Sequence, residues 1–296
     1  MSLGTFLDKR SPLLMASPLL VTLVVFSLFP LFYAIGLSLT DSTLARPFHE
    51  YVGLLNYKRA VTDAIFRTSI VNTIVYAFGA TIVETILGFM LALFFYREMG
   101  AGRYLRTLAL LPFIAPPVAV AMIWRLIYYP LYGLLDHYLL RLHIVQEPVA
   151  FLGNTATALP SIMLTDIWQW TPFVFLLSLA ALQSLPMEPY EAAAVDGANS
   201  WQIFRHLTLP MVAPILLIIA IIRLVGAFKV FDLVYILTFG GPGSSTQVAS
   251  FYIYKMAFMK FKTGRAAALT IVFLIVVSVI VTLLTIFRDR IRARYE

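Results

Sequence analysis

Long apolar runs separated by short polar segments dominate this sequence, and residues 11–40 contain no charged residue at all. A transmembrane helix needs about 20 mostly apolar residues to cross a hydrocarbon layer about 30 Å thick. Transmembrane strands would instead give runs of about 10 residues that alternate in polarity, a pattern this sequence lacks. Six runs are long enough for helices, at residues 14–39, 71–96, 107–128, 160–184, 209–230 and 266–287. The pattern therefore predicts an all-α integral membrane protein with six transmembrane helices.

The composition narrows the class of protein further. Hydrophobic residues make up 60% of the 296 residues and charged residues only 12%, whereas soluble domains contain about 25% charged residues. No cysteine occurs, so disulfides, thiolate metal ligands and cysteine nucleophiles are excluded. The four histidines are scattered without a metal-binding spacing, so we expect no metal site. The net charge of +7 is typical of basic cytoplasmic loops and does not indicate nucleic-acid binding.

Basic residues near the span ends set the orientation of a membrane protein. In the predicted topology, the two sides of the membrane hold equal numbers of lysine and arginine residues. On the side that holds the N-terminus, these residues lie in shorter segments and next to the spans, as with Arg97, Arg103 and Arg106. We therefore expect both termini in the cytoplasm. The predicted layout is a cytoplasmic N-terminal segment, a six-span domain, a cytoplasmic loop inside that domain and a cytoplasmic tail, at residues 1–13, 14–287, 186–210 and 288–296.

The loop between the fourth and fifth predicted spans has ordered local chemistry. Pro189 suits the first turn of a helix, and three alanines that favour helix follow it. Gly197 suits a left-handed C-terminal cap. Asn199 and Gln202 have the spacing of a capping box, which predicts a second short helix that ends near Leu207. Such an alanine-rich loop either permits close approach of another protein or rests on the inner face of the membrane.

The same loop contains a spaced motif. Its residues, Glu191-Ala192-Ala193, Gly197 and Leu207-x-Leu209-Pro210, follow the pattern E-A-A-x3-G-x9-I-x-L-P, with Leu207 in place of isoleucine. This resembles the EAA signature of the membrane permeases of binding-protein-dependent ABC importers.

Further motifs resemble the carbohydrate-uptake branch of that family, and its maltose-type subunit in particular. They are Pro30, Gly53-Leu54-x-Asn56-Tyr57, Leu111-Pro112, Trp168 with Pro172, Gly240-Gly241-Pro242, Tyr254-x3-Phe258 and Ala266-Ala267-Ala268. Together they are distributed over nearly the whole chain.

The resemblance implies a non-catalytic subunit of a transporter in a bacterial or archaeal cell membrane. The sequence agrees, because it contains no G-x4-G-K-[ST] nucleotide-binding loop. The implied partners are a second homologous permease, two ATPase subunits that bind ATP and magnesium, an extracytoplasmic binding protein, membrane lipid and a sugar, but no nucleic acid. The loop would act as the coupling helix that docks on an ATPase, through Glu191, Ala192, Ala193, Asp196, Gly197, Leu209 and Pro210. ATP-driven closure would then alternate access to the site between the two sides.

Apart from Lys229 at the end of the fifth span, four charged residues lie inside the predicted spans, where a charge costs a few kcal/mol and is expected to face protein or water. Glu84 serves either the pathway or an interhelical contact. Asp166 and Arg125 lie near the outer ends of their spans and either pair or reach the interface. Arg223 lies 14 residues into the fifth span, or about 21 Å deep, which favours a pathway or interfacial role.

A substrate site is expected where aromatic rings and hydrogen-bonding groups occur together. Gln169, Trp170 and Phe173 lie in the outer half of the fourth span, at a depth similar to that of Arg223. By resemblance to the maltose permease, these four residues line the sugar pathway. The alternative is an interfacial aromatic belt.

Other functions remain as alternatives. Arg125 and Arg223 would suit an anionic polyol or an acidic sugar, such as a glycerol phosphate, within the same importer class. A self-contained channel or secondary transporter would need a selectivity filter or paired broken helices, and neither pattern occurs.

Overall fold

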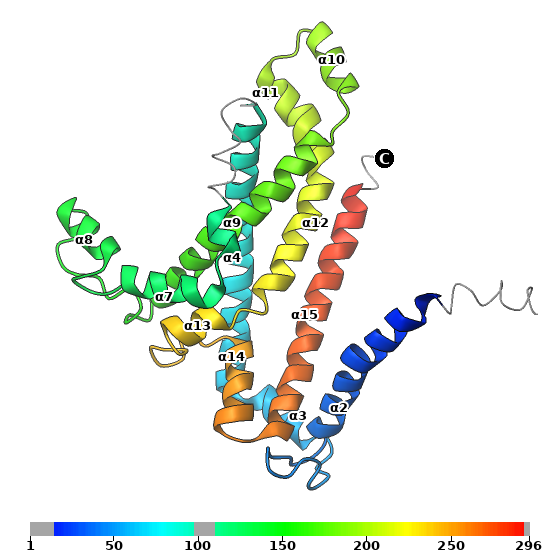
Figure 1. The fold of residues 1–296 in the computed structure, drawn as a ribbon, viewed down its shortest axis with the longest axis vertical. Coiled ribbons are helices and arrows are strands. Elements are labelled where there is room, and N and C mark those ends of the chain that lie inside the picture. Colours follow the sequence, from blue (N-terminus) through cyan, green and yellow to red (C-terminus); the bar gives the residue numbers. More distant parts are fainter. Residues whose placement is uncertain (1–14, 98–109, 293–296) are drawn as a thin grey trace, which may run out of the picture. The chain divides into compact units, whose positions relative to one another are not determined.

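The computed structural model describes residues 15–97 and 110–292 and is helical throughout, without a strand in those ranges (Figure 1). The helices are α2 (Phe29–Ser38), α3 (Leu55–Thr62), α4 (Ala64–Arg97), α6 (Leu111–Ile114), α7 (Pro117–Ile127), α8 (Leu134–Arg141), α9 (Ala158–Gln183), α10 (Glu188–Val195), α11 (Ser200–Ile203), α12 (Leu209–Ala227), α13 (Asp232–Leu237), α14 (Ala249–Tyr254) and α15 (Thr263–Arg292), with π-helical turns at Val24–Leu28, Phe204–Thr208 and Lys255–Met259. The all-helical class is as predicted.

Five helices in the described part of the chain are long and apolar enough to cross a membrane, so this is a multi-pass membrane protein. They are Met15–Ser38, Ala64–Tyr96, Ala158–Gln183, Ser200–Ala227 and Thr263–Arg290. The number differs from the six that the apolar runs predicted.

The difference lies in the predicted span at 107–128. Its described part forms two short helices, α6 and α7, with Ala115 (ψ 136°) and Pro116 (ψ 137°) extended between them. The residue before a proline is pushed out of the helical region, and the Pro116-Pro117 pair therefore interrupts the helix. Residues 107–109 of that predicted span lie outside the described residues.

Two further helices begin well before the predicted residue, by seven and nine positions. The helix predicted from residue 71 begins at Ala64, because the polar residues of its first turns bond back to the helix: Thr68 Oγ1 donates to the carbonyl oxygen of Ala64 at 3.1 Å, and Ser69 Oγ to that of Ile65 at 2.7 Å. The helix predicted from residue 209 begins at Ser200. The π-helical turn that precedes Pro210 lets the helix continue, since a proline cannot donate to the preceding turn.

The chain divides into two compact units. In the first, which comprises residues up to 63 and 253–274, buried Asn56 donates to the carbonyl oxygens of Ser38 (3.0 Å) and Thr40 (2.9 Å) at the end of α2. These contacts satisfy carbonyl groups that a helix end leaves open. Arg265 at the start of α15 pairs with Asp63 at 2.6 Å.

The second unit, residues 64–252 and 275–296, contains the main core. Within it α4, α9 and α12 run together, with α10 and α11 at one end of α9 and α12 and with α7 and α13 toward the other end (Figure 1). Gly88 permits the close approach of α4 to α9, because a Cβ there would lie 2.8 Å from the backbone nitrogen of Phe175. Tight packing of these helices places charged side chains from all three in one buried cluster.

Candidate functional site

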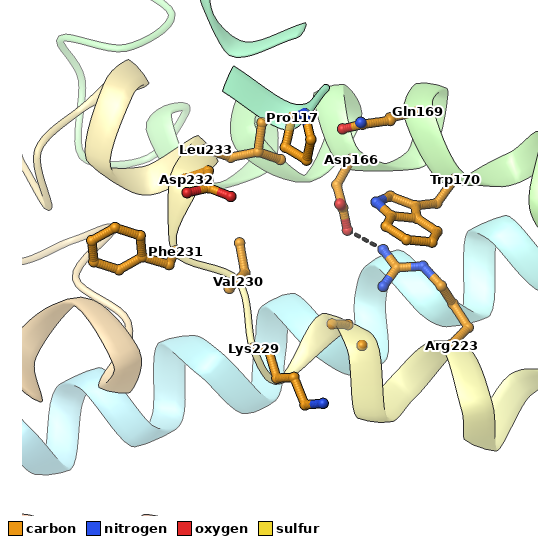
Figure 2. Close-up of a pocket in the computed structure, with 12 residues that line it drawn as sticks. Pro117, Asp166, Gln169, Trp170, Arg223, Lys229, Val230, Phe231, Asp232 and Leu233 are labelled. Carbon is orange, nitrogen blue, oxygen red and sulfur yellow. Dashed lines mark hydrogen bonds and ion pairs between the residues drawn. The ribbon is translucent and has the colours of Figure 1, made fainter. Parts of the chain in front are cut away.

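Three charged residues from three helices meet inside the bundle. Arg223 of α12 lies between Glu84 of α4 and Asp166 of α9: its Nε is 2.5 Å from Glu84 Oε2, and its Nη2 is 2.9 Å from Glu84 Oε1. The same Nη2 also donates to Asp166 Oδ2 (Figure 2). All three side chains are almost completely buried. A buried charge is tolerated when it is paired and hydrogen-bonded, and here each charge has an opposite partner.

An aromatic cluster covers the guanidinium of Arg223. Its carbon Cζ lies 4.8 Å from the centre of the Trp170 ring, within the range of a cation–π contact. Phe113 lies 5.4 Å, centre to centre, from both Trp170 and Phe173. Trp170 is therefore held between a cation and neighbouring rings.

A pocket of about 120 Å³ opens beside this cluster (Figure 2). Its lining residues are Pro117, Asp166, Gln169, Trp170, Arg223, Gly226, Ala227, Lys229, Val230, Phe231, Asp232 and Leu233. Gln169 is only 2% exposed, and its Nε2 donates to the carbonyl oxygen of Ala115 at 3.1 Å. Its Oε1 has no hydrogen-bond partner among the described residues. The lining of the pocket thus includes a buried acceptor that has no hydrogen-bond partner among the described residues.

The structure brings together three of the four residues expected at a substrate site. Gln169, Trp170 and Arg223 line the pocket, whereas Phe173 packs on Trp170 and is absent from the lining. Arg125 does not pair with Asp166; it is exposed, and its Nη1 donates to the carbonyl oxygen of Ile236 at 3.3 Å.

The turn between α12 and α13 supplies lining residues that the sequence did not indicate. Lys229 and Asp232 flank this turn, because α12 ends at Ala227 and α13 begins at Asp232. No ion pair joins the two residues in the described part of the chain, and both lie at the edge of the pocket. In the sequence, only the break between two apolar segments near Lys229 indicates this turn.

The loop that carries the E-A-A motif forms the two helical segments that its residues predict. Pro189 lies in the first turn of α10, Gly197 has φ +73°, and α11 follows. The capping box is present: Gln202 N donates to Asn199 Oδ1 at 2.9 Å, and Asn199 N donates to Gln202 Oε1 at 2.8 Å. The second segment does not end at Leu207 but continues into α12.

The surface of this loop is hollowed between its two helices. The hollow has a volume of about 390 Å³ and is lined by Ala193, Asp196, Gly197, Ala198, Gln202, Ile203, His206 and Leu207. Glu191, Ala192 and Asp196 are exposed on the same loop. Within residues 15–97 and 110–292, no group of three or more His, Asp or Glu residues is arranged to hold a metal ion.

Fold and pocket together define a helical, multi-pass membrane protein with a polar site inside its bundle. The chain belongs to the family of binding-protein-dependent transport system inner membrane components, whose model matches residues 84–296. It is 35% identical over 281 residues to the trehalose/maltose transport system permease protein MalF of Thermococcus litoralis, covering 94% of this chain and 93% of that protein. It is 37% identical over 253 residues to a probable ABC transporter permease of Sinorhizobium fredii, covering 85% and 81% of the two chains.

A solved structure has the same fold. The chain is similar to a chain in the crystal structure of a bacterial alginate ABC transporter in complex with an alginate pentasaccharide-bound periplasmic protein. The TM-score is 0.82, the sequence identity is 26%, and the match covers 98% of both chains.

Proposed function

We propose that this chain is a permease subunit of an ATP-driven importer that translocates a sugar or sugar derivative by alternating access. The relative named for trehalose and maltose transport, and the alginate transporter of similar fold, support a carbohydrate substrate. The observation that carries the proposal is the pocket beside Trp170, where hydrogen-bonding groups lie buried in an otherwise apolar bundle. Gln169, Trp170 and Arg223 form part of the substrate pathway, with Phe173 supporting Trp170 from behind.

The chain works as one part of a larger assembly in the cell membrane of a bacterium or an archaeon. We infer a second homologous permease, two ATPase subunits that hold ATP and magnesium, and an extracytoplasmic binding protein that delivers the sugar. The family, whose transport is binding-protein-dependent, and the periplasmic protein in the solved relative support this assembly. This subunit is non-catalytic, and ATP is hydrolysed by its partners.

The proposed topology places both termini and the loop at 186–210 in the cytoplasm. The segment at 107–128 completes a sixth crossing, and the six-span domain extends over residues 14–287, between a cytoplasmic segment at 1–13 and a tail at 288–296. The tight bundle of α4, α9 and α12 supports this arrangement, because the loop and the pocket then lie toward opposite ends of the same helices.

The loop acts as the coupling element. Its exposed acid Glu191 and its small residues Ala192 and Ala193 permit close docking of an ATPase, and Asp196 and Gly197 form the bend. Leu209 and Pro210 join the bend to α12, which carries Arg223 to the pocket. Movement of the loop is thereby transmitted to the pocket along a single helix.

Uptake by the whole complex tests this function. The complex, isolated through a tag on this chain and reconstituted in proteoliposomes, is expected to accumulate labelled trehalose or maltose only with ATP and its binding protein. Accumulation without ATP would indicate a secondary transporter or a channel instead. Failure to accumulate either sugar, with active ATPase, would remove the carbohydrate assignment.

A further inference from the structure

We propose that the substrate pocket selects uncharged carbohydrates over anionic ones, and that Glu84 sets this selectivity from outside the pocket by neutralising Arg223. The proposal rests on the function proposed above and narrows its substrate class. It runs against the sequence-based alternative, in which Arg223 attracts an acidic sugar or a phosphorylated polyol.

The first step is the charge of the cluster. Arg223 carries one positive charge and contacts two carboxylates, those of Glu84 and Asp166. Both carboxylates are buried away from solvent, since the side chains of Glu84 and Asp166 are 0% and 6% exposed. The cluster therefore offers no net positive charge to a ligand, and with both acids ionised it presents a net negative one. Coulomb interactions are strong at such depth, because little water screens them.

The second step is the geometry around the guanidinium. Nε and Nη2, two of the three nitrogens, face carboxylate oxygens, and the Trp170 ring covers one face of the group. A carboxylate or phosphate is bound best by two parallel N–H donors on one edge of an arginine. Glu84 occupies the edge formed by Nε and Nη2, and Asp166 takes the second N–H of Nη2. The edge formed by Nη1 and Nη2 therefore lacks one of its two donors, and Arg223 cannot form such a pair with an anionic ligand on either edge.

The third step is the polar group that the pocket leaves open. Because Nε2 of Gln169 donates to Ala115, its Oε1 is the atom without a partner, and it is a hydrogen-bond acceptor. Asp166 adds carboxylate oxygens to the same lining. Acceptors of this kind bind hydroxyl donors and repel ligand oxygens that carry charge. A neutral, hydroxyl-rich ring satisfies Gln169 at no electrostatic cost.

The remaining charges at the pocket do not alter this balance. Lys229 and Asp232 are both exposed and of opposite sign. In Figure 2 the ammonium group of Lys229 points away from Asp166 and Arg223. The selectivity thus depends on the buried cluster, and Glu84 is its one member that does not line the pocket.

Ligand binding to the intact complex in nanodiscs, without binding protein, tests the proposal. Saturation-transfer NMR titrations compare methyl glucoside with methyl glucuronide, which differ only in a hydroxymethyl against a carboxylate group. Trehalose serves as a larger neutral probe. Wild type is expected to bind the glucuronide at least about tenfold more weakly than the glucoside. Glu84→Gln is expected to reduce the ratio of glucoside affinity to glucuronide affinity several-fold, while the affinity for the glucoside itself changes little. The control is Glu147→Gln, which removes an exposed carboxylate and is expected to leave this ratio unchanged.

The possible outcomes separate the two proposals. Equal affinity of wild type for glucoside and glucuronide overturns the selectivity while leaving a carbohydrate pocket in place. An unchanged ratio in a folded Glu84→Gln complex, with thermal stability near wild type, overturns the role of Glu84. If that variant does not assemble, Asp166→Asn removes one negative charge from the same cluster while Arg223 stays paired with Glu84, and an unchanged ratio there overturns the charge of the cluster as the cause of the selectivity. Absence of binding by all three probes, trehalose included, overturns the carbohydrate pocket itself.

Discussion

Arg223 Nε lies 2.5 Å from Glu84 Oε2, so one ion pair joins α12 to α4 across 139 residues of sequence. Asp166 on α9 contacts the same guanidinium. Three helices of the bundle are thereby held by one cation, and the register between them is fixed by charge as well as by packing. Because α12 also follows directly from the loop that carries the E-A-A motif, the ion cluster joins the helix of that loop to α4 and α9.

Removing the shared cation is predicted to destabilise the protein strongly. Arg223→Met leaves Glu84 and Asp166 buried without a partner, which typically costs about 3–5 kcal/mol. Thermal unfolding of the purified complex measures this loss. Arg288→Met is the matched control, because Arg288 pairs with Asp289 at the surface and such pairs contribute about 0–1 kcal/mol. Equal unfolding temperatures for the two variants would contradict a structural role for the cluster.

Local chemistry explains why the conformation of the loop with the E-A-A motif could be predicted from sequence. The conformation of Gly197 and the Asn199–Gln202 capping box depend only on residues within a few positions. The end of the second helix could not be predicted in this way. A π-helical turn before Pro210 extends the helix through a proline that normally marks a helix start, and no local pattern in the sequence indicates such a turn.

The buried cluster illustrates the opposite case. The sequence shows single charges in three apolar runs, and their signs alone allow Glu84, Asp166 and Arg223 to pair. Depth estimates from run boundaries instead offered Arg125 as the partner of Asp166, with interfacial positions for both residues as the alternative. Those boundaries were in error where the polar residues Thr68 and Ser69 bond back to their own helix, and where the Pro116-Pro117 pair interrupts an apolar run. The pairing of Glu84, Asp166 and Arg223 joins residues far apart in the sequence, and hydrophobic periodicity does not predict such pairs.

Gly197→Val is predicted to weaken the coupling between this chain and the ATPase subunits. A β-branched residue is strained at φ +73°, and nothing lies within 4 Å of the position that its Cβ would occupy, so the effect would come from the backbone alone. Binding-protein-stimulated ATPase activity and uptake are both expected to fall several-fold, with normal insertion. Gly243→Val is the control, since Gly243 has φ +61° and similarly open space in a different loop. Normal stimulated activity in the Gly197 variant would exclude a coupling role.

The proposed topology can be tested with single cysteines, because the native chain has none. Asn154→Cys and Ser200→Cys both introduce a thiol at an exposed position. A membrane-impermeant maleimide added to whole cells or spheroplasts is expected to label position 154 only, and position 200 is expected to react after permeabilisation. The reverse pattern would place the E-A-A loop outside, where no ATPase can reach it.

Trp170→Ala is predicted to reduce sugar uptake through the pocket. The Trp170 ring covers Arg223 and lines the pocket next to Gln169, so its removal takes away both a stacking surface and the cover over the cation. Aromatic contacts of this kind contribute about 0.5–1.5 kcal/mol beyond the area they bury, which corresponds to a roughly 2- to 12-fold loss of affinity.

The matched control for Trp170 lies two residues away on the same helix. Trp168 is 43% exposed, packs 5.7 Å from Trp124, and points to the other side of α9, because two residues turn a helix by about 200°. Trp168→Ala is therefore expected to leave uptake near wild type. In both variants, ATPase stimulation by the loaded binding protein is expected to persist, since the E-A-A loop is unchanged. Equal uptake by the two variants at limiting sugar would show that Trp170 only supports the bundle, and the sugar contacts would then belong to other lining residues or to the second permease.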